Sequence, residues 1–155
     1  MPIRPVRSII AGQTPITASR NSTALEAASL MKQQGKGALL VVDGTRLIGI
    51  LTERDIVFRV VAAGRDPAGT KLGEVMTPQP QTIHPNEPFL RALRIMHQGG
   101  FRHLPVVEND WPLGIVSSRD ALEDDLSQLL ADLAQRGDER DRTGTRRRHR
   151  RVAVR

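Results

Sequence analysis

The sequence contains no cysteine and no tyrosine, and it has one tryptophan and three phenylalanines in 155 residues. The lack of cysteine excludes disulfides, thiolate metal sites and cysteine nucleophiles. The four histidines, at positions 84, 97, 103 and 149, do not have the spacing of metal ligands. No apolar run approaches the roughly 18 residues of a membrane span, and the N-terminus lacks the apolar core of a signal peptide. These absences predict a soluble protein of the cytoplasm.

Catalytic patterns are also missing from the sequence. It shows no nucleophile paired with a base, no pair of carboxylates with a catalytic spacing and no phosphate-cradling glycine loop. We therefore expect a protein that is not an enzyme and that requires no cofactor.

The net charge of +6 is concentrated at one end of the chain. Residues 136–155 hold nine arginines against three acids, whereas residues 1–135 hold equal numbers of basic and acidic side chains. Because so few apolar residues lie in this basic tail, we expect residues 136–155 to be disordered.

One stretch of the sequence occurs twice. Residues 15–55 match residues 80–120 without a gap when the sequence is shifted by 65 positions. Repeated sequence indicates repeated structure. A unit of this length buries too little surface to be stable alone, so the two copies are expected to pack together as one domain.

Each copy has the pattern of a strand, a helix, two strands and a second helix, which predicts the α/β (α+β) fold class. In the first copy a capping box at residues 23–26 starts the first helix, and Gly35 ends it. The continuous apolar runs at 38–42 and 104–107 predict strands that are buried on both faces.

Each copy closes on a short polar motif, Thr52-Glu53-Arg54-Asp55 and Ser117-Ser118-Arg119-Asp120. The motif follows a predicted strand and begins a helix, whose free N–H groups and dipole favour an anion such as phosphate. An aspartate in the first helical turn can accept hydrogen bonds from the two hydroxyls of ribose. For one copy alone, simple helix capping explains the same residues. Two copies in register favour a nucleotide site.

The same residues carry a family resemblance. The pattern L-x-V-V-D-x5-G-I-L-T-x-R-D at 39–55, with its copy at 104–120, resembles the CBS (cystathionine β-synthase) domain. The segment 75–78, Val-Met-Thr-Pro, is similar to the usual opening of that domain. The resemblance covers roughly residues 5–130. It implies two β-α-β-β-α repeats that pack as one pseudo-symmetric (Bateman) module, with clefts that bind adenosine-containing ligands such as AMP, ADP, ATP or S-adenosylmethionine.

The resemblance places repeat 1 at residues 5–66 and repeat 2 at residues 70–130. By position, the two motif aspartates would hold ribose hydroxyls, the motif Thr and Ser would contact ribose or phosphate, and backbone near Thr17 and Thr82 would contact adenine. The expected ligand-binding residues are Thr17, Thr52, Arg54, Asp55, Thr82, Arg102, His103, Ser117, Arg119 and Asp120.

The two clefts are expected to differ. The position before the strand at 104–107 often holds a basic phosphate ligand in this family, and here it is Arg102, followed by His103. The corresponding position in repeat 1 is Gly37, next to Lys36. The alternative for Arg102 is an ordinary solvated arginine.

The expected function is a regulatory module that binds an adenine nucleotide and signals occupancy to an effector protein, with no enzyme domain fused to it. A homodimer through the helices is expected. The leucine stripe Leu122, Leu126, Leu129 and Leu133 either packs on the chain's own core or meets a partner helix. Residues 142–151 could contact nucleic acid or another anionic surface. The alternatives are a nucleic-acid-binding protein acting through this tail, and a structural dimer without ligand.

Overall fold

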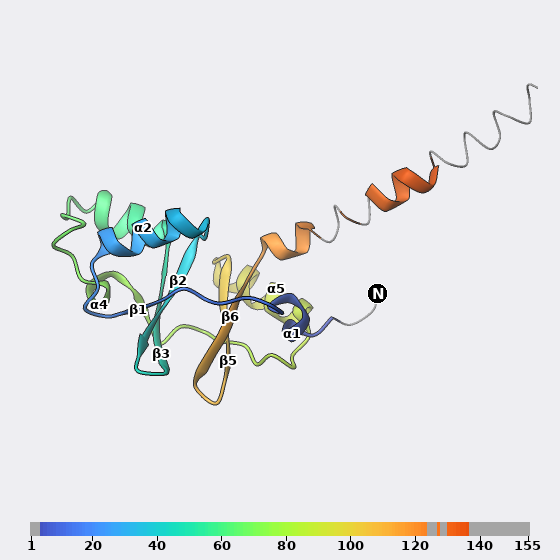
Figure 1. The fold of residues 1–155 in the computed structure, drawn as a ribbon, viewed down its shortest axis with the longest axis horizontal. Helices are drawn as coiled ribbons and strands as arrows, with labels where there is room; N and C mark the ends of the chain where they lie inside the picture. Colours follow the sequence, from blue (N-terminus) through green and yellow to red (C-terminus); the bar gives the residue numbers. More distant parts are fainter. Residues whose placement is uncertain (1–3, 124–126, 128–129, 137–155) are drawn as a thin grey trace, which may run out of the picture. The chain divides into compact units, whose positions relative to one another are not determined.

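The computed structural model describes residues 4–123, 127 and 130–136, which fall into two compact units. The first unit ends at Ser118 and contains the elements labelled in Figure 1. The second begins at Arg119 and is helical wherever it is described. The expected disordered tail lies outside the described residues, except for Arg136.

The elements of the first unit alternate between helix and strand. In chain order they are α1 (Val6–Ile9), β1 (Thr17–Ser19), α2 (Ala24–Gln34), β2 (Ala38–Asp43), β3 (Arg46–Thr52), α3 (Glu53–Asp55), η1 (Ile56–Val61), α4 (Leu72–Val75), β4 (Thr77–Pro78), α5 (Phe89–Gly99), β5 (His103–Glu108) and β6 (Trp111–Ser117).

The strands form two sheets. One has the order β1-β2-β3-β4, in which β1 is parallel to β2 and the other pairs are antiparallel. The other is the antiparallel pair β5-β6. In repeat 2 the counterpart of β1 is reduced to a single bridge between Ile83 and Val106. The α/β class and the strand-helix-strand-strand order are confirmed.

Local signals in the sequence set the helix ends. Thr23 N–H donates to Glu26 Oε2 and Glu26 N–H donates to Thr23 Oγ1, both at 3.1 Å, which is the predicted capping box. Gly35 ends α2 with φ 62 and Gly100 ends α5 with φ 70. Glycine adopts this left-handed conformation at little cost, so the predicted stop forms at Gly35 and an equivalent stop forms at Gly100.

Both faces of the four-stranded sheet are covered. Residues 38–41 are all buried, as the apolar run predicted. On one face, the strands pack with helical residues in a core formed by Ile16, Ala24, Ala27, Met31, Leu39, Val41, Leu51, Val60, Leu72 and Val75. On the other face, Ala38, Leu40 and Ile50 pack with Ile115 from β6. The two repeats therefore meet sheet against sheet.

The helix after β3 is not a regular α-helix. It begins at Glu53, as α3, and continues from Ile56 as the π-helix η1. Ala62 N–H donates to the carbonyl of Val57 at 2.8 Å, one residue further back than in an α-helix. The sequence pattern predicted a helix here and gave no sign of the wider turn.

The opening segment of each repeat is attached to the other repeat. Val6 N–H donates to Glu87 O, and Phe89 N–H donates to Arg4 O, both at 2.8 Å, so α1 is attached to repeat 2. Leu72 N–H donates to Ser22 O at 2.9 Å, and β4 pairs with β3, so α4 and β4 belong structurally to repeat 1. Figure 1 shows this exchange, with α1 beside α5.

Candidate functional site

The junction of β3 and α3 holds Thr52 and Asp55 in a reciprocal capping box. Asp55 Oδ2 accepts the Thr52 N–H at 2.9 Å and the Thr52 hydroxyl at 3.1 Å. The Thr52 hydroxyl in turn accepts the Asp55 N–H at 3.3 Å. Helix capping, the ordinary explanation of the motif, is therefore present in repeat 1.

The second oxygen of Asp55 has capacity for a further hydrogen bond. Asp55 Oδ1 lies 3.7 Å from Arg59 Nε, and the side chain is 13% exposed. A carboxylate offers about four acceptor positions, and the cap and Arg59 leave part of them open. The capping box thus holds the Asp55 carboxylate in place and leaves part of its acceptor capacity open.

Three residues from both repeats converge beside this junction. Glu53 N–H donates to Gly37 O at 3.0 Å. A Cβ placed on Gly37 would lie 3.2 Å from Glu53 Oε1 and 3.2 Å from His103 Nε2. The His103 imidazole from β5 therefore reaches the position at which repeat 1 lacks a side chain. Sequence reasoning missed Glu53, although it lies inside the motif.

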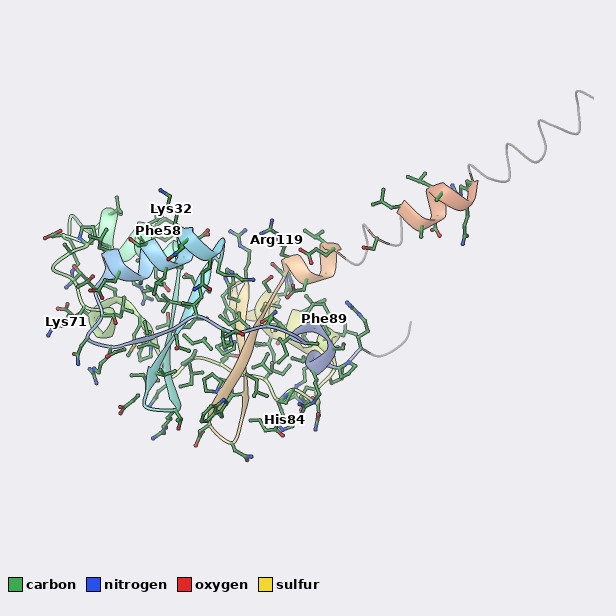
Figure 2. The ribbon with its side chains drawn as sticks, in the orientation of Figure 1. Lys32, Phe58, Lys71, His84, Phe89 and Arg119 are labelled. Atoms are coloured by element: carbon green, nitrogen blue, oxygen red, sulfur yellow. The ribbon has the colours of Figure 1, made fainter. Side chains whose placement is uncertain are left out.

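The remaining expected residues of repeat 1 are spread around the junction. Thr17 is exposed on β1 and pairs in register with Leu40. Arg54 holds its guanidinium over the ring of Phe58, 5.2 Å from the centroid. Phe58, labelled in Figure 2, is exposed on η1. Arg54 is thus engaged by an aromatic ring rather than by the Asp55 carboxylate.

The expected residues of repeat 2 fall in both units. Arg102 is exposed before β5, and its carbonyl accepts the Ser118 N–H at 3.1 Å. Ser117 ends β6 opposite His103. Arg119 and Asp120 belong to the second unit, where they start its helix.

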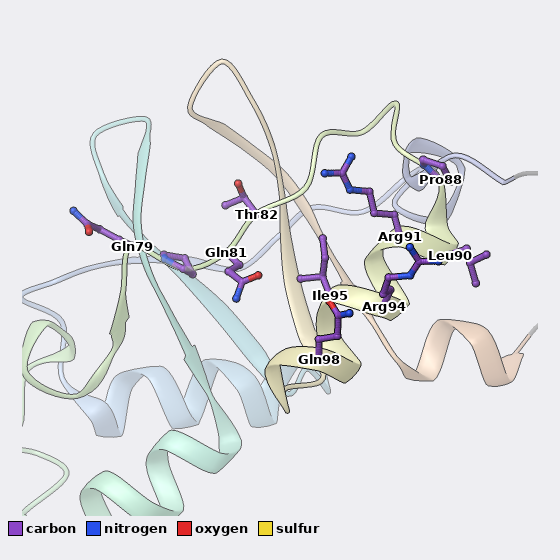
Figure 3. A pocket seen from close by; sticks show the side chains of 10 residues that line it. Gln79, Gln81, Thr82, Pro88, Leu90, Arg91, Arg94, Ile95 and Gln98 are labelled. Atoms are coloured by element: carbon purple, nitrogen blue, oxygen red, sulfur yellow. The ribbon is translucent and has the colours of Figure 1, made fainter.

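Thr82 lines a groove of about 1070 Å³ between residues 79–82 and helix α5. Figure 3 shows Thr82 and Gln81 on the loop, with Arg91 and Arg94 on the helix. The structure thus brings Thr82 together with residues that the sequence reasoning did not select.

Other polar clusters lie outside the motif. The pKa of Glu74 is held below its usual range, chiefly because its carboxylate accepts the Lys71 N–H at 2.8 Å.

Across residues 4–123, 127 and 130–136, no three His, Asp or Glu side chains are grouped so as to hold a metal ion. In the same part of the chain, none of the helices combines the length and apolarity needed to traverse a bilayer.

Comparison with known proteins agrees with the internal repeat. Residues 6–62 and 72–127 each match the family model of the CBS domain. The chain is 41% identical over 115 residues to the CBS domain-containing protein YhcV of Bacillus subtilis, an alignment that covers 74% of this chain and 81% of the relative. Some other curated relatives are longer proteins, of which the chain spans about half or less.

Solved structures with the same fold include two informative examples. A putative signal-transduction protein with CBS domains from Burkholderia ambifaria is 31% identical, with a TM-score of 0.75 over 80% of this chain and 95% of the other. The CBS domain pair of protein MJ0100, in complex with 5′-methylthioadenosine and S-adenosyl-L-methionine, is 30% identical, with a TM-score of 0.71 over 84% of this chain and 98% of the other.

Proposed function

The chain belongs to the CBS-domain family, and on that basis we propose that it is a regulatory module that binds adenosine-containing ligands between its two repeats. It acts by binding rather than by catalysis, and it passes occupancy to an effector protein. A ligand can shift the packing of the repeats only by as much as its affinity differs between the two arrangements.

The Asp55 carboxylate carries this proposal. It is held by Thr52, is mostly buried, and keeps acceptor capacity on Oδ1. Such a group suits the paired hydroxyls of a ribose. The motif occurs a second time in the sequence, ending at Asp120. The MJ0100 domain pair, which has the same fold, was solved with two adenosine-containing ligands.

The experiment is calorimetry with adenosine, AMP, ATP and S-adenosylmethionine on wild type, two single variants and one double variant. Asp55→Ala removes a capping-box acid at the proposed site, whereas Glu26→Ala removes one from α2. Each loss of a cap should cost about 1 kcal/mol of stability. Asp55→Ala should also weaken adenosine binding about tenfold or more, because charge-assisted hydrogen bonds contribute roughly 1.5–3 kcal/mol.

Glu26→Ala should bind adenosine as wild type does. Combining Asp55→Ala with Asp120→Ala should abolish binding in both clefts. Equal adenosine affinities in wild type and the double variant would overturn the assignment.

Assembly is part of the same proposal. Helices α2 and η1 expose Leu25, Val57, Phe58 and Val61, each at least half exposed. Exposed apolar side chains on two neighbouring helices favour a protein interface, and a two-fold homodimer is the commonest oligomer type. In the predicted leucine stripe, Leu122 and Leu133 are exposed, while Leu126 and Leu129 lie outside the described residues.

A further inference from the structure

The groove between residues 79–82 and helix α5 has an unusual set of side chains. Two arginines, Arg91 and Arg94, stand on the helix wall together with Gln98 (Figure 3). Gln81 and Thr82 lie on the loop wall, and none of the ten lining residues is acidic. The groove therefore offers many hydrogen-bond donors and a positive charge on one wall.

The two arginines are close neighbours, but their positive charges are not equally neutralised by acidic side chains. They are three residues apart on α5, so they lie on adjacent positions of one helix face, about 4.5 Å apart along the axis. Arg91 Nη1 donates to Glu87 Oε1 at 2.8 Å. In the part of the chain that the structure describes, no acidic side chain pairs with Arg94. Adjacent like charges destabilise a helix, and an anion in the groove would relieve that cost.

We propose that this groove is a binding site for a ligand with two or more adjacent phosphate groups, held by Arg91 and Arg94 together. Guanidinium groups bind phosphate through paired N–H donors, and two of them one turn apart match two linked phosphates. The amides of Gln81 and Gln98 supply further donors from both walls. Leu90 and Ile95 add an apolar stretch on which an attached organic group could rest.

The groove differs from the Asp55 junction in its lining, which contains neither Thr52 nor Asp55, although it includes Thr82, the residue that the resemblance places near adenine. It does not rest on adenosine binding, since its test uses pyrophosphate, which contains no ribose or adenine. Asp55→Ala should leave the pyrophosphate response unchanged, so failure of either proposal is visible independently of the other.

Hydrogen exchange on the full chain tests the proposal, because it reports where an anion binds and so separates the groove from the basic tail. Pyrophosphate should slow exchange in residues 79–98 and leave residues 24–34 of α2 unchanged. Arg94→Gln should raise the pyrophosphate concentration needed for this protection about tenfold, the effect of losing one charge-assisted contact. Arg46→Gln, the matched control, removes an equal charge at an exposed position of β3 and should bind as wild type.

Two further ligands identify the source of the phosphates. ADP acting at lower concentration than pyrophosphate indicates a nucleotide site, and equal potency indicates a site for linked phosphates alone; both support the groove. Orthophosphate protecting residues 79–98 as well as pyrophosphate does would overturn the requirement for adjacent phosphates. Protection confined to other segments, or an Arg94→Gln variant equal to the Arg46→Gln control, would overturn the site itself.

Discussion

Gly49 on β3 lies directly against the side chain of Met76, which comes from the opening segment of repeat 2. A Cβ on Gly49 would overlap Met76 and would lie 3.2 Å from the carbonyl oxygen of Thr77. The same relationship recurs at Gly114, where a Cβ would lie 3.0 Å from the Cβ of Ile10 in the opening segment of repeat 1. In both copies the glycine of the Gly-Ile pair makes room for the other copy's chain.

Gly49→Ala should therefore destabilise the protein. The added methyl forces Met76 or the β3-β4 pair to move, and overpacking of this kind costs about 1–3 kcal/mol. Urea unfolding gives the difference. Gly69→Ala is the control, because its Cβ would make only ordinary contact, 3.4 Å from Asp66 Oδ2. Equal midpoints for the two variants would show that β4 yields without cost.

Arg102→Ala tests the asymmetry that we expect between the two proposed clefts. Arg102 is exposed beside His103, whose imidazole reaches Gly37 in repeat 1. We expect the variant to lose AMP affinity about tenfold, the effect of one charge-assisted contact, and to keep its affinity for adenosine. Calorimetry with both ligands measures this. Equal losses for AMP and adenosine would argue against a phosphate contact, and the Asp55 cleft is the one in which we expect the effect.

Phe58→Glu should convert the proposed homodimer into a monomer. Phe58 is 57% exposed on η1 among other apolar side chains, and a buried unpaired charge there would oppose association. Light scattering at micromolar concentration reports the mass. Trp111→Glu changes an aromatic residue of similar exposure, 54%, on β6 and should leave the dimer intact. A monomeric wild type would refute the interface outright.

Truncation after Gln135 should separate the tail from the module. It removes the whole net charge of +6, and with it any salt-dependent retention on nucleic acid. Adenosine affinity and the thermal midpoint should stay nearly unchanged, because the cores and Asp55 lie before Ser118. A loss of adenosine binding on truncation would mean that residues 136–155 contribute to the cleft.

The sequence predicted those features that depend on a few neighbouring residues. The capping box at Thr23, the stop at Gly35 and the strand at 38–42 were all predicted from local patterns, and residues 38–41 of that strand are buried. The π-helix was not, because the apolar side chains of η1 fit either helical period over so short a segment. Val60 is fully buried in η1, whereas the matching position of repeat 2 is Asp125, so the copies differ in sequence where their last helices are compared.

Contacts between the two copies could not be predicted from the sequence. The repeat predicted that the two copies pack together, but no pattern indicates that His103 should reach Gly37. The groove at α5 was missed because Arg91 and Arg94 read as ordinary solvated helix residues. The roles of the expected ligand-binding residues stay predictions, since the ribose and phosphate contacts were inferred by resemblance.

Because the opening segments are exchanged, the residues that fold together in one half are not the residues of one sequence repeat. The first core runs from Ile16 to Val75, whereas the first family match runs from residue 6 to residue 62. A fragment cut at the sequence repeat, 5–66, would lack Leu72, Val75 and the strand that closes the sheet edge at β3. A fragment of residues 14–79 would keep them all. To express one half of this chain, or to graft it onto another protein, the cuts should fall before β1 and after β4.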